Sequence, residues 1–365
     1  MKLDHLGIEV DDLYTVELFY RRALGFTPRY RYVSRNTPGL RTVFLERDGV
    51  RLELLERPRA PGFLEQRRQE PNHVSIEVDD VDASHAELHR LAFPGVILKP
   101  ARNTGDGFRE MELRDPEGNV VELSSRIAPE PRYPVRAVIF DFDGTLIDSE
   151  PNYYLADQEI LGRRGIPFGQ ENKRRYIGGS SLDMWADLRV RLALPESAAE
   201  LVALRDALYL EIALTRTQVF PEMRRLWDRV RGWPIPIAVA SGSAPGVLRR
   251  LLGAVGLAGD VQIVLSAEEV PRGKPAPDVF LEAARRLGVP PEECLVIEDT
   301  GYGVEAAKRA FMRCIAVPYL SDPPLADAFL MADLLFADGM TGFDAERAFA
   351  WLEPLLSAGS INKSG

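Results

Sequence analysis

Hydrophobic and polar residues follow two different rhythms along this chain of 365 residues. In the first third, short stretches alternate between apolar and polar residues, which is typical of half-buried strands. Two segments with helical spacing, residues 13–23 and 81–91, each follow such a strand. Turn-separated strands come after each helix, and the last of them opens with a Gly turn before an apolar run. The pattern predicts a βαβββ module that occurs twice.

The two modules also match in sequence. Residues 4–12, DHLGIEVDD, return 68 residues later as NHVSIEVDD, and residues 48–54, DGVRLEL, return 69 residues later as EGNVVEL. Two matches at almost the same period indicate a duplication. We therefore predict an α+β domain of paired modules over residues 1–126. Because open sheet edges favour pairing, we expect the modules to join within the chain or across a homodimer.

The second part of the chain has the pattern of an α/β fold. Short apolar runs alternate with helical segments, which predicts a Rossmann-like, doubly wound parallel sheet. The gap between the first two runs is too long for one crossover. Its helical segments, around residues 153–164, 181–192 and 197–214, predict an inserted α-helical cap over the carboxyl edge of the sheet, where ligands bind. The expected strands are residues 137–140, 235–240, 261–265, 295–297, 314–317 and 333–337.

A proline-rich segment separates the two parts. Residues 128–134, APEPRYP, hold three prolines, which neither a helix nor a central strand tolerates. We predict a linker over residues 127–135, a second domain over 136–345 with its cap at about 150–222, and a C-terminal helix and tail over 346–365.

Composition and charge narrow the range of functions. The formal net charge of −10 argues against a nucleic-acid partner, since such proteins usually show a basic excess. No run approaches the ~20 apolar residues of a membrane span, and an acidic pair precedes any signal-like stretch. The two cysteines, Cys294 and Cys314, lie in apolar runs and predict buried side chains rather than disulfides or a zinc cluster. We expect a cytoplasmic protein without membrane contact.

The duplication places metal-competent residues at equivalent positions. His5 corresponds to His73, and Glu53 corresponds to Glu122. The chain has four histidines in all, so two at matched strand positions are notable. Neutral imidazole and carboxylate are common ligands of divalent cations. The alternative is that each His bonds to backbone and each Glu is solvated; the symmetry of the four favours a metal site.

This first part resembles the vicinal oxygen chelate superfamily, which includes glyoxalase I, methylmalonyl-CoA epimerase, extradiol dioxygenases and bleomycin-binding proteins. The resemblance rests on residues 4–7 (DHLG), 24–26 (LGF), 72–73 (NH) and 115–119 (DPEGN). It implies a divalent transition metal such as Ni²⁺, Co²⁺, Zn²⁺, Fe²⁺ or Mn²⁺, and a substrate with two adjacent oxygens. A Glu53 or Glu122 carboxylate would move a proton next to a metal acting as Lewis acid. The implied ligands are His5, Glu53, His73 and Glu122.

Four polar sets follow strands or turns in the second part. Asp141 and Asp143 end an apolar strand; a Ser-Gly-Ser turn at residues 241–243 ends another; Lys274 lies in a Pro-rich turn; and an acidic pair occupies positions 298–299. Lone acidic pairs and lysines are usually surface charge. Because the carboxyl ends of parallel strands share one edge, four such sets predict a single site for an anion and a hard cation.

These motifs are similar to those of the haloacid dehalogenase superfamily, in its branch of phosphatases and sugar-phosphate mutases with a helical cap. The resemblance covers residues 136–340. It implies that Asp141 is the nucleophile that becomes an aspartyl phosphate, and that Asp143 is the general acid and then the base. The implied phosphate-binding residues are Ser241, Gly242, Lys274 and Thr145, and the implied Mg²⁺ ligands are Asp141, the Asp143 carbonyl and Asp299, supported by Glu298.

The cap offers weaker signals. Residues 173–175 (KRR) and 177–180 (IGGS) predict either a substrate loop or an ordinary solvated helix face and turn. Lys173 is the one cap lysine that a Schiff-base mechanism would use. The whole sequence is read as a bifunctional enzyme, a Mg²⁺-dependent phosphatase of a small phosphorylated metabolite fused to a glyoxalase- or epimerase-like domain. A sugar-phosphate mutase, or a phosphatase with a non-catalytic ligand-binding module, are the alternatives.

Overall fold

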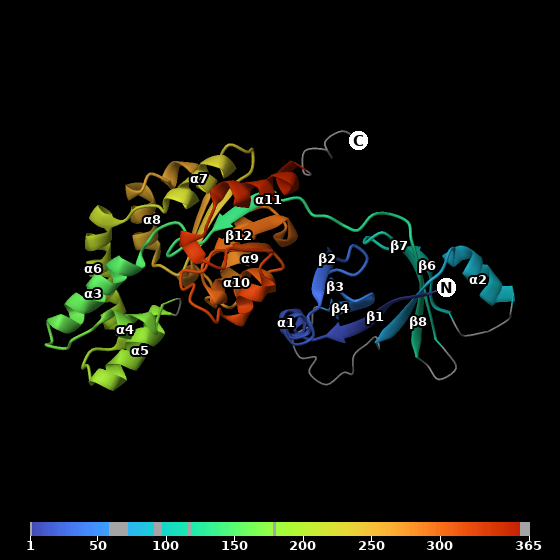
Figure 1. Ribbon diagram of the computed structural model, residues 1–365, viewed down its shortest axis with the longest axis horizontal. Coiled ribbons are helices and arrows are strands. Elements are labelled where there is room, and N and C mark those ends of the chain that lie inside the picture. Colours follow the sequence, from blue (N-terminus) through green and yellow to red (C-terminus); the bar gives the residue numbers. More distant parts are fainter. Residues whose placement is uncertain (1, 58–71, 91–96, 115–118, 178–179, 358–365) are drawn as a thin grey trace. The chain divides into compact units, whose positions relative to one another are not determined.

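The computed structural model describes residues 2–57, 72–90, 97–114, 119–177 and 180–357. The turn at 115–118 and the pair Gly178-Gly179, both singled out in the sequence, lie outside these residues. The chain divides into two compact units, Met1–Arg132 and Tyr133–Gly365 (Figure 1). Within the described residues, no helix has both the length and the apolar character needed to span a membrane.

The first unit is one mixed eight-stranded sheet with the order β2-β3-β4-β1-β5-β8-β7-β6. Strand β1 runs antiparallel to β5, so the two βαβββ modules join within the chain. This confirms the paired modules predicted from the repeat. The elements are β1 (Lys2–Val10), α1 (Leu13–Leu24), β2 (Thr27–Val33), β3 (Arg41–Arg47) and β4 (Val50–Glu56), then β5 (His73–Glu77), α2 (Val81–Arg90), β6 (Ile97–Asn103), β7 (Phe108–Arg114) and β8 (Val120–Arg126).

Strand register brings the matched positions together. Gly7 of β1 pairs with Glu53 of β4 on one side and with His73 of β5 on the other. Two residues earlier, His5 stands opposite Ser75, whose other neighbour is Glu122 of β8. Side chains two apart on a strand share a face, so the duplication builds one site at the centre of the sheet.

The second unit contains a six-stranded parallel sheet with the order β11-β10-β9-β12-β13-β14 and a helical insertion, which confirms the predicted α/β fold (Figure 1). The strands are β9 (Ala137–Phe140), β10 (Ile237–Ser241), β11 (Ile263–Ser266), β12 (Cys294–Glu298), β13 (Arg313–Ala316) and β14 (Leu334–Leu335). The inserted helices are α3 (Glu150–Gly162), α4 (Gln170–Arg174), α5 (Ser181–Leu192) and α6 (Ala198–Arg216). The sheet is flanked by α7 (Pro221–Val230), α8 (Pro245–Ala254), α9 (Asp278–Leu287), α10 (Gly301–Arg309) and α11 (Ala345–Ser357).

Burial explains the all-apolar strands of this sheet. Every residue of β9, β10 and β12 is buried, because helices cover both faces of a parallel sheet. Cys294 and Cys314 are buried free thiols, as predicted. The insertion has a separate core around Ile160, Trp185 and Leu201, which is why its sequence keeps its own helical periodicity.

Candidate functional sites

The first candidate site lies at the carboxyl end of β9, the strand between β10 and β12. Asp141 follows the strand directly, and its backbone N–H donates to the Ile297 carbonyl at 2.9 Å. The chain then turns at Gly144, whose φ of +82° favours glycine. A Cβ on Gly144 would come within 2.3 Å of an Asp299 carboxylate oxygen. The turn therefore brings the end of β9 against the acidic pair that ends β12.

Lys274 crosses from its turn into this acidic cluster. Its Nζ donates to Asp141 Oδ1 and to Glu298 Oε1, each at 2.6 Å. Oxygens of Asp141, Glu298 and Asp299 lie within 4.8 Å of one another. Burial and the repulsion of Glu298 and Asp143 outweigh the attraction of Lys274 and raise the pKa of Asp141 to about 7.

A cation suits this cluster. Burial and the neighbouring carboxylates Glu298 and Asp141 raise the pKa of Asp299 well above its usual range, which means that one lysine does not offset the acids. A hard divalent cation prefers oxygen ligands and would supply the missing charge. Asp141 and Asp299 are the residues that would hold it, since both Glu298 oxygens already accept hydrogen bonds, from Lys274 and from the Asp299 and Thr300 amides.

The Thr145 side chain contacts the Asp299 carboxylate and is not exposed to solvent. It is fully buried, and its hydroxyl donates to Asp299 Oδ1 at 2.9 Å. Gly242, by contrast, is exposed at the end of β10. Of the residues expected to hold a phosphoryl group, Thr145 therefore orients a carboxylate in this structure.

Asp143 points away from the cluster and toward the Ser-Gly-Ser turn. Its Oδ2 accepts from Ser241 Oγ at 2.9 Å and from Ser243 Oγ at 2.6 Å. Its Oδ1 accepts from Tyr209 of α6 at 3.4 Å. The Ser243 hydroxyl uses its proton on Asp143, so the Tyr153 hydroxyl, 2.8 Å from Ser243 Oγ, must be the donor in that pair.

Three of these contacts were missed from the sequence. Ser243 belongs to the predicted turn but had no assigned role, and Tyr153 and Tyr209 come from the inserted helices. Their rings stack with centroids 3.7 Å apart and an interplanar angle of 6°. In the sequence, Tyr153 and Tyr209 are marked only by the helical spacing of apolar residues. Ordinary core residues have the same spacing, so it does not indicate a role in the site.

Lys173 of the insertion is buried, so a solvated helix face is the wrong interpretation for this residue. Its Nζ bonds to Asp157 Oδ2 at 2.8 Å, and Asp157 is fully buried. Glu150 Oε2 lies 3.7 Å away. The Lys173 side chain is therefore engaged with a buried carboxylate, whereas a Schiff-base lysine needs an amine that is available to attack a carbonyl.

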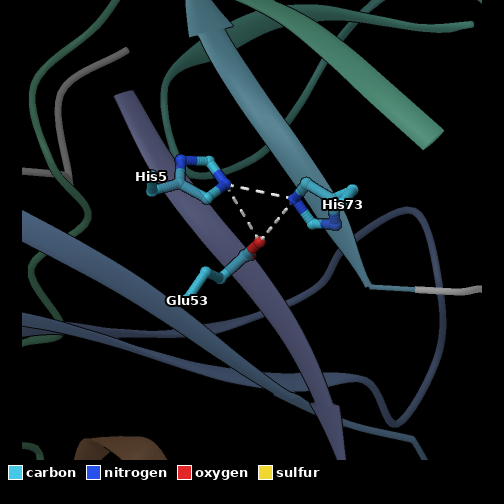
Figure 2. Close-up of side chains that lie close together, drawn as sticks. All are labelled: His5, Glu53 and His73. Carbon is cyan, nitrogen blue, oxygen red and sulfur yellow. Dashed lines mark hydrogen bonds and ion pairs between the residues drawn. The ribbon is translucent and has the colours of Figure 1, made fainter. Parts of the chain in front are cut away.

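The second candidate site lies in the first unit, where His5, Glu53 and His73 point toward one another (Figure 2). The Nε2 atoms of the two histidines are 3.2 Å apart, and Glu53 Oε2 lies 3.3 Å from His5 Nε2 and 3.4 Å from His73 Nε2. Ligand atoms bound ~2.1 Å from one ion stand about 3.0–3.4 Å apart. The three atoms have the spacing that a single divalent cation requires.

The surroundings of these ligands also fit a cation. Asp4 Oδ2 lies 2.8 Å from His5 Nδ1, an arrangement that keeps the proton on Nδ1 and leaves Nε2 for a metal. Arg51 in turn donates to Asp4 at 2.6 Å. Burial opposes protonation of His5, but hydrogen bonds to Asp4 and Glu53 outweigh it and raise the pKa of His5 to about 10. The carboxylates that favour positive charge on His5 would equally favour a bound cation.

Glu122, the fourth predicted ligand, stands slightly apart. Its Oε1 lies 3.8 Å from His5 Nε2 and accepts from Ser75 Oγ at 2.9 Å. Burial, its largest influence, raises the pKa of Glu122. A cavity of about 270 Å³ borders Glu53, His73 and Glu122, so a small molecule can reach the three side chains.

Comparison with known proteins finds a family match for each of the two units. Residues 135–310 match the haloacid dehalogenase-like hydrolase family, and residues 2–123 match the Glyoxalase/Bleomycin resistance protein/Dioxygenase superfamily. The chain is 32% identical over 188 residues to fructose-1-phosphate phosphatase YqaB of Escherichia coli (strain K12), which covers 50% of this chain and 96% of that protein. It is 33% identical over 193 residues to beta-phosphoglucomutase of Bacillus subtilis (strain 168), covering 50% and 83%.

A solved structure agrees on the fold. CbbY from Rhodobacter sphaeroides, in complex with phosphate, superimposes with a TM-score of 0.50 at 24% identity and covers 57% of this chain and 98% of its own. The parallel sheet with acidic strand ends and a helical insertion thus defines a Rossmann-like α/β domain with a helical cap. The chain belongs to the haloacid dehalogenase-like hydrolases, with a glyoxalase-superfamily domain fused ahead of the hydrolase.

Proposed function

We propose that the second unit is a Mg²⁺-dependent phosphatase of a small sugar or polyol phosphate. The observation that carries the proposal is the convergence of Asp141, Lys274 and Asp299 within one buried cluster, with Asp143 close by on the same strand end. Relatives named as fructose-1-phosphate phosphatase and hexitol phosphatase B support this substrate class.

In the proposed reaction, an Asp141 oxygen attacks phosphorus and the bond to the ester oxygen breaks. Asp143 gives its proton to the departing alkoxide, then takes a proton from the water that cleaves the aspartyl phosphate. Ser241 and Lys274, with the Gly242 amide, would hold phosphoryl oxygens. Bound Mg²⁺, held by Asp141, the Asp143 carbonyl and Asp299, would offset the negative charge of the phosphoryl group.

A phosphatase screen over a panel of sugar and polyol phosphates, with and without Mg²⁺, tests this proposal. We expect phosphate release that depends on Mg²⁺ and disappears in Asp141→Asn, because the amide keeps the shape but cannot attack phosphorus. Substantial turnover by folded Asp141→Asn would contradict the nucleophile assignment. Isomerised sugar phosphate without free phosphate would instead identify a mutase.

For the first unit, we propose a divalent transition-metal site that serves proton transfer on a substrate with two adjacent oxygens. The mutual spacing of His5, Glu53 and His73 supports it, and Glu122 would complete the set. The bound metal would polarise the substrate oxygens, while Glu53 or Glu122 would move the proton. A two-imidazole, two-carboxylate shell is softer than the all-oxygen shell that Mg²⁺ prefers.

Metal analysis of the full chain tests this site. We expect one Ni²⁺, Co²⁺, Zn²⁺, Fe²⁺ or Mn²⁺ per chain beyond the Mg²⁺ of the phosphatase, and its loss in His73→Ala. A chain that takes up none of these ions at micromolar concentration would contradict the chelate site. Metal and ligand binding without turnover would leave the unit a ligand-binding module of the phosphatase.

A further inference from the structure

The cavity beside the proposed metal site is lined by strands of both modules, and the duplication makes these strands comparable position by position. Phe44 of β3 stands opposite Glu53, while Glu112 of β7 stands opposite Glu122. Because Glu53 and Glu122 are equivalent, Glu112 occupies the place of Phe44. The same pairing across β2–β3 and β6–β7 equates Thr42 with Glu110, Tyr30 with Lys99, and Tyr32 with Arg102.

The first module fills these places with an aromatic cluster. Tyr30, Tyr32 and Phe44 are buried together, and the Tyr30 and Phe44 rings stack with centroids 4.5 Å apart. The second module places ionic groups there instead. Lys99 Nζ and Arg102 Nη2 both donate to Glu112 Oε1, at 2.9 and 2.8 Å.

This difference is not required by the fold. Partly burying four ionisable groups costs desolvation free energy that packed aromatic rings avoid. In the first module, the equivalent strands β2 and β3 fold with packed aromatic side chains at these positions. The charged wall of the second module, Lys99, Arg102, Glu110 and Glu112, therefore needs another explanation, and all four residues line the cavity.

Two buried atoms at this wall point to what the cavity accepts. Arg102 Nη1 and Asp106 Oδ1 each lack a hydrogen-bond partner among the residues that the structure describes, and both residues line the cavity. A guanidinium is always charged, and its strongest partners are carboxylate and phosphoryl oxygens. The Asp106 oxygen would accept from a hydroxyl. A ligand with an anionic group and a hydroxyl, in the cavity that both residues line, would offer partners to these two side chains.

We propose that the charged wall binds the anionic end, a carboxylate or phosphoryl group, of a small hydroxylated substrate of the first unit. The substrate's adjacent oxygens bind at His5, Glu53, His73 and Glu122, so this inference rests on the function proposed for that site. Arg102 is the principal anion-binding residue, and Lys99 adds positive charge beside it. Of the aromatic cluster, Tyr32 lines the cavity and contributes shape without charge.

Three matched probes test the charged wall on the full chain loaded with Co²⁺. Lactate carries two adjacent oxygens and no further acid; malate adds a carboxylate; 2-hydroxy-3-phosphonopropanoate carries a non-hydrolysable phosphonate in its place. We expect malate or the phosphonate to bind about tenfold tighter than lactate by calorimetry, which is typical of one charge-assisted hydrogen-bonded contact. Whichever binds more tightly distinguishes a carboxylate ligand from a phosphoryl one.

Arg102→Gln should abolish this preference while Co²⁺ uptake and lactate affinity stay unchanged. Arg102→Lys, which keeps the charge but not the paired N–H groups, should retain part of it and serves if the Gln variant unfolds. Arg90→Gln, which removes an exposed arginine of α2, is the matched control.

Equal affinity of the wild-type protein for all three probes, or a preference that survives in Arg102→Gln, would overturn the inference. If the wild-type chain binds neither Co²⁺ nor any of the other transition metals named above, the proposed metal function itself fails. In that case the same calorimetric titrations on metal-free protein test the charged wall separately from the metal site. We still expect malate or the phosphonate to bind more tightly than lactate, and this preference to depend on Arg102.

Discussion

Gly7 and His73 are direct neighbours across β1 and β5, and a Cβ on Gly7 would lie 1.8 Å from His73 Cε1. The imidazole therefore lies over a position where only hydrogen fits. On its other side Gly7 pairs with Glu53, so the missing side chain leaves room for a histidine from one neighbouring strand to reach a glutamate from the other.

Gly7→Ala should displace the His73 ring and weaken metal binding at this site about 10- to 100-fold, the range seen when a ligand's support is lost. It should also destabilise the unit by about 1–3 kcal/mol through overpacking. Metal content after dialysis and thermal unfolding measure the two effects. In a His73→Ala background the extra methyl meets no ring, so its stability cost should vanish; an unchanged cost would contradict the steric explanation.

In the hydrolase domain, Gly303 leaves room for the Glu298 side chain, as Gly7 does for His73. A Cβ there would come within 1.8 Å of the Glu298 carboxylate, which holds Lys274. Gly303→Ala should therefore lower kcat at least about tenfold, since a displaced catalytic geometry is costly. Gly253→Ala on α8 is the matched control, because among the described residues no heavy atom beyond its chain neighbours and its own helix backbone lies within 4 Å of the added Cβ. Equal activity of the two variants would argue against the role of Glu298.

Asp143→Asn tests the acid role of the second aspartate. Poor leaving groups need a proton in the transition state and good ones do not. We expect the variant to slow hydrolysis of alkyl phosphates far more than hydrolysis of p-nitrophenyl phosphate, measured as kcat/KM. Equal slowing of both substrates would mean that Asp143 does not protonate the leaving group.

Tyr153→Phe tests whether the insertion positions Asp143 through Ser243. The variant keeps the ring stacked on Tyr209 and removes the proton donated to Ser243. One hydrogen bond contributes about 0.5–1.5 kcal/mol, so kcat should fall about 3- to 10-fold with KM nearly unchanged.

The neighbouring Tyr154 provides the control for this variant. Its hydroxyl donates to the Phe168 carbonyl inside the insertion, away from Asp143. Tyr154→Phe should leave kcat unchanged. A similar loss of kcat in both variants would indicate a general weakening of the helical insertion instead of a positioning role.

Lys173→Met should destabilise the insertion by about 3–5 kcal/mol, because it leaves the fully buried Asp157 carboxylate without its partner. The double variant Lys173→Met/Asp157→Leu should recover most of this loss, since it removes both charges. Urea unfolding measures both. If the single variant is as stable as the wild type, the ion pair contributes nothing to the fold.

Local pattern and duplication were sufficient to predict much of this protein. A buried parallel strand must be apolar, so its polar end is visible in the sequence, and Asp141 and Glu298 could be assigned to one sheet edge. Likewise, a repeat preserves strand register, so His5 with His73 and Glu53 with Glu122 could be paired before their contacts were known.

Tertiary structure alone decided which other side chains meet these residues. Tyr209 reaches Asp143 across 66 positions of sequence, and Lys173 is buried by pairing with Asp157 on another helix. Arg102 and Asp106 became candidates only when the cavity was located and the equivalent strands of the two modules could be compared. Such contacts depend on how helices and sheets pack, and the free energy of packing is shared among many distant residues. No short segment of sequence contains that information.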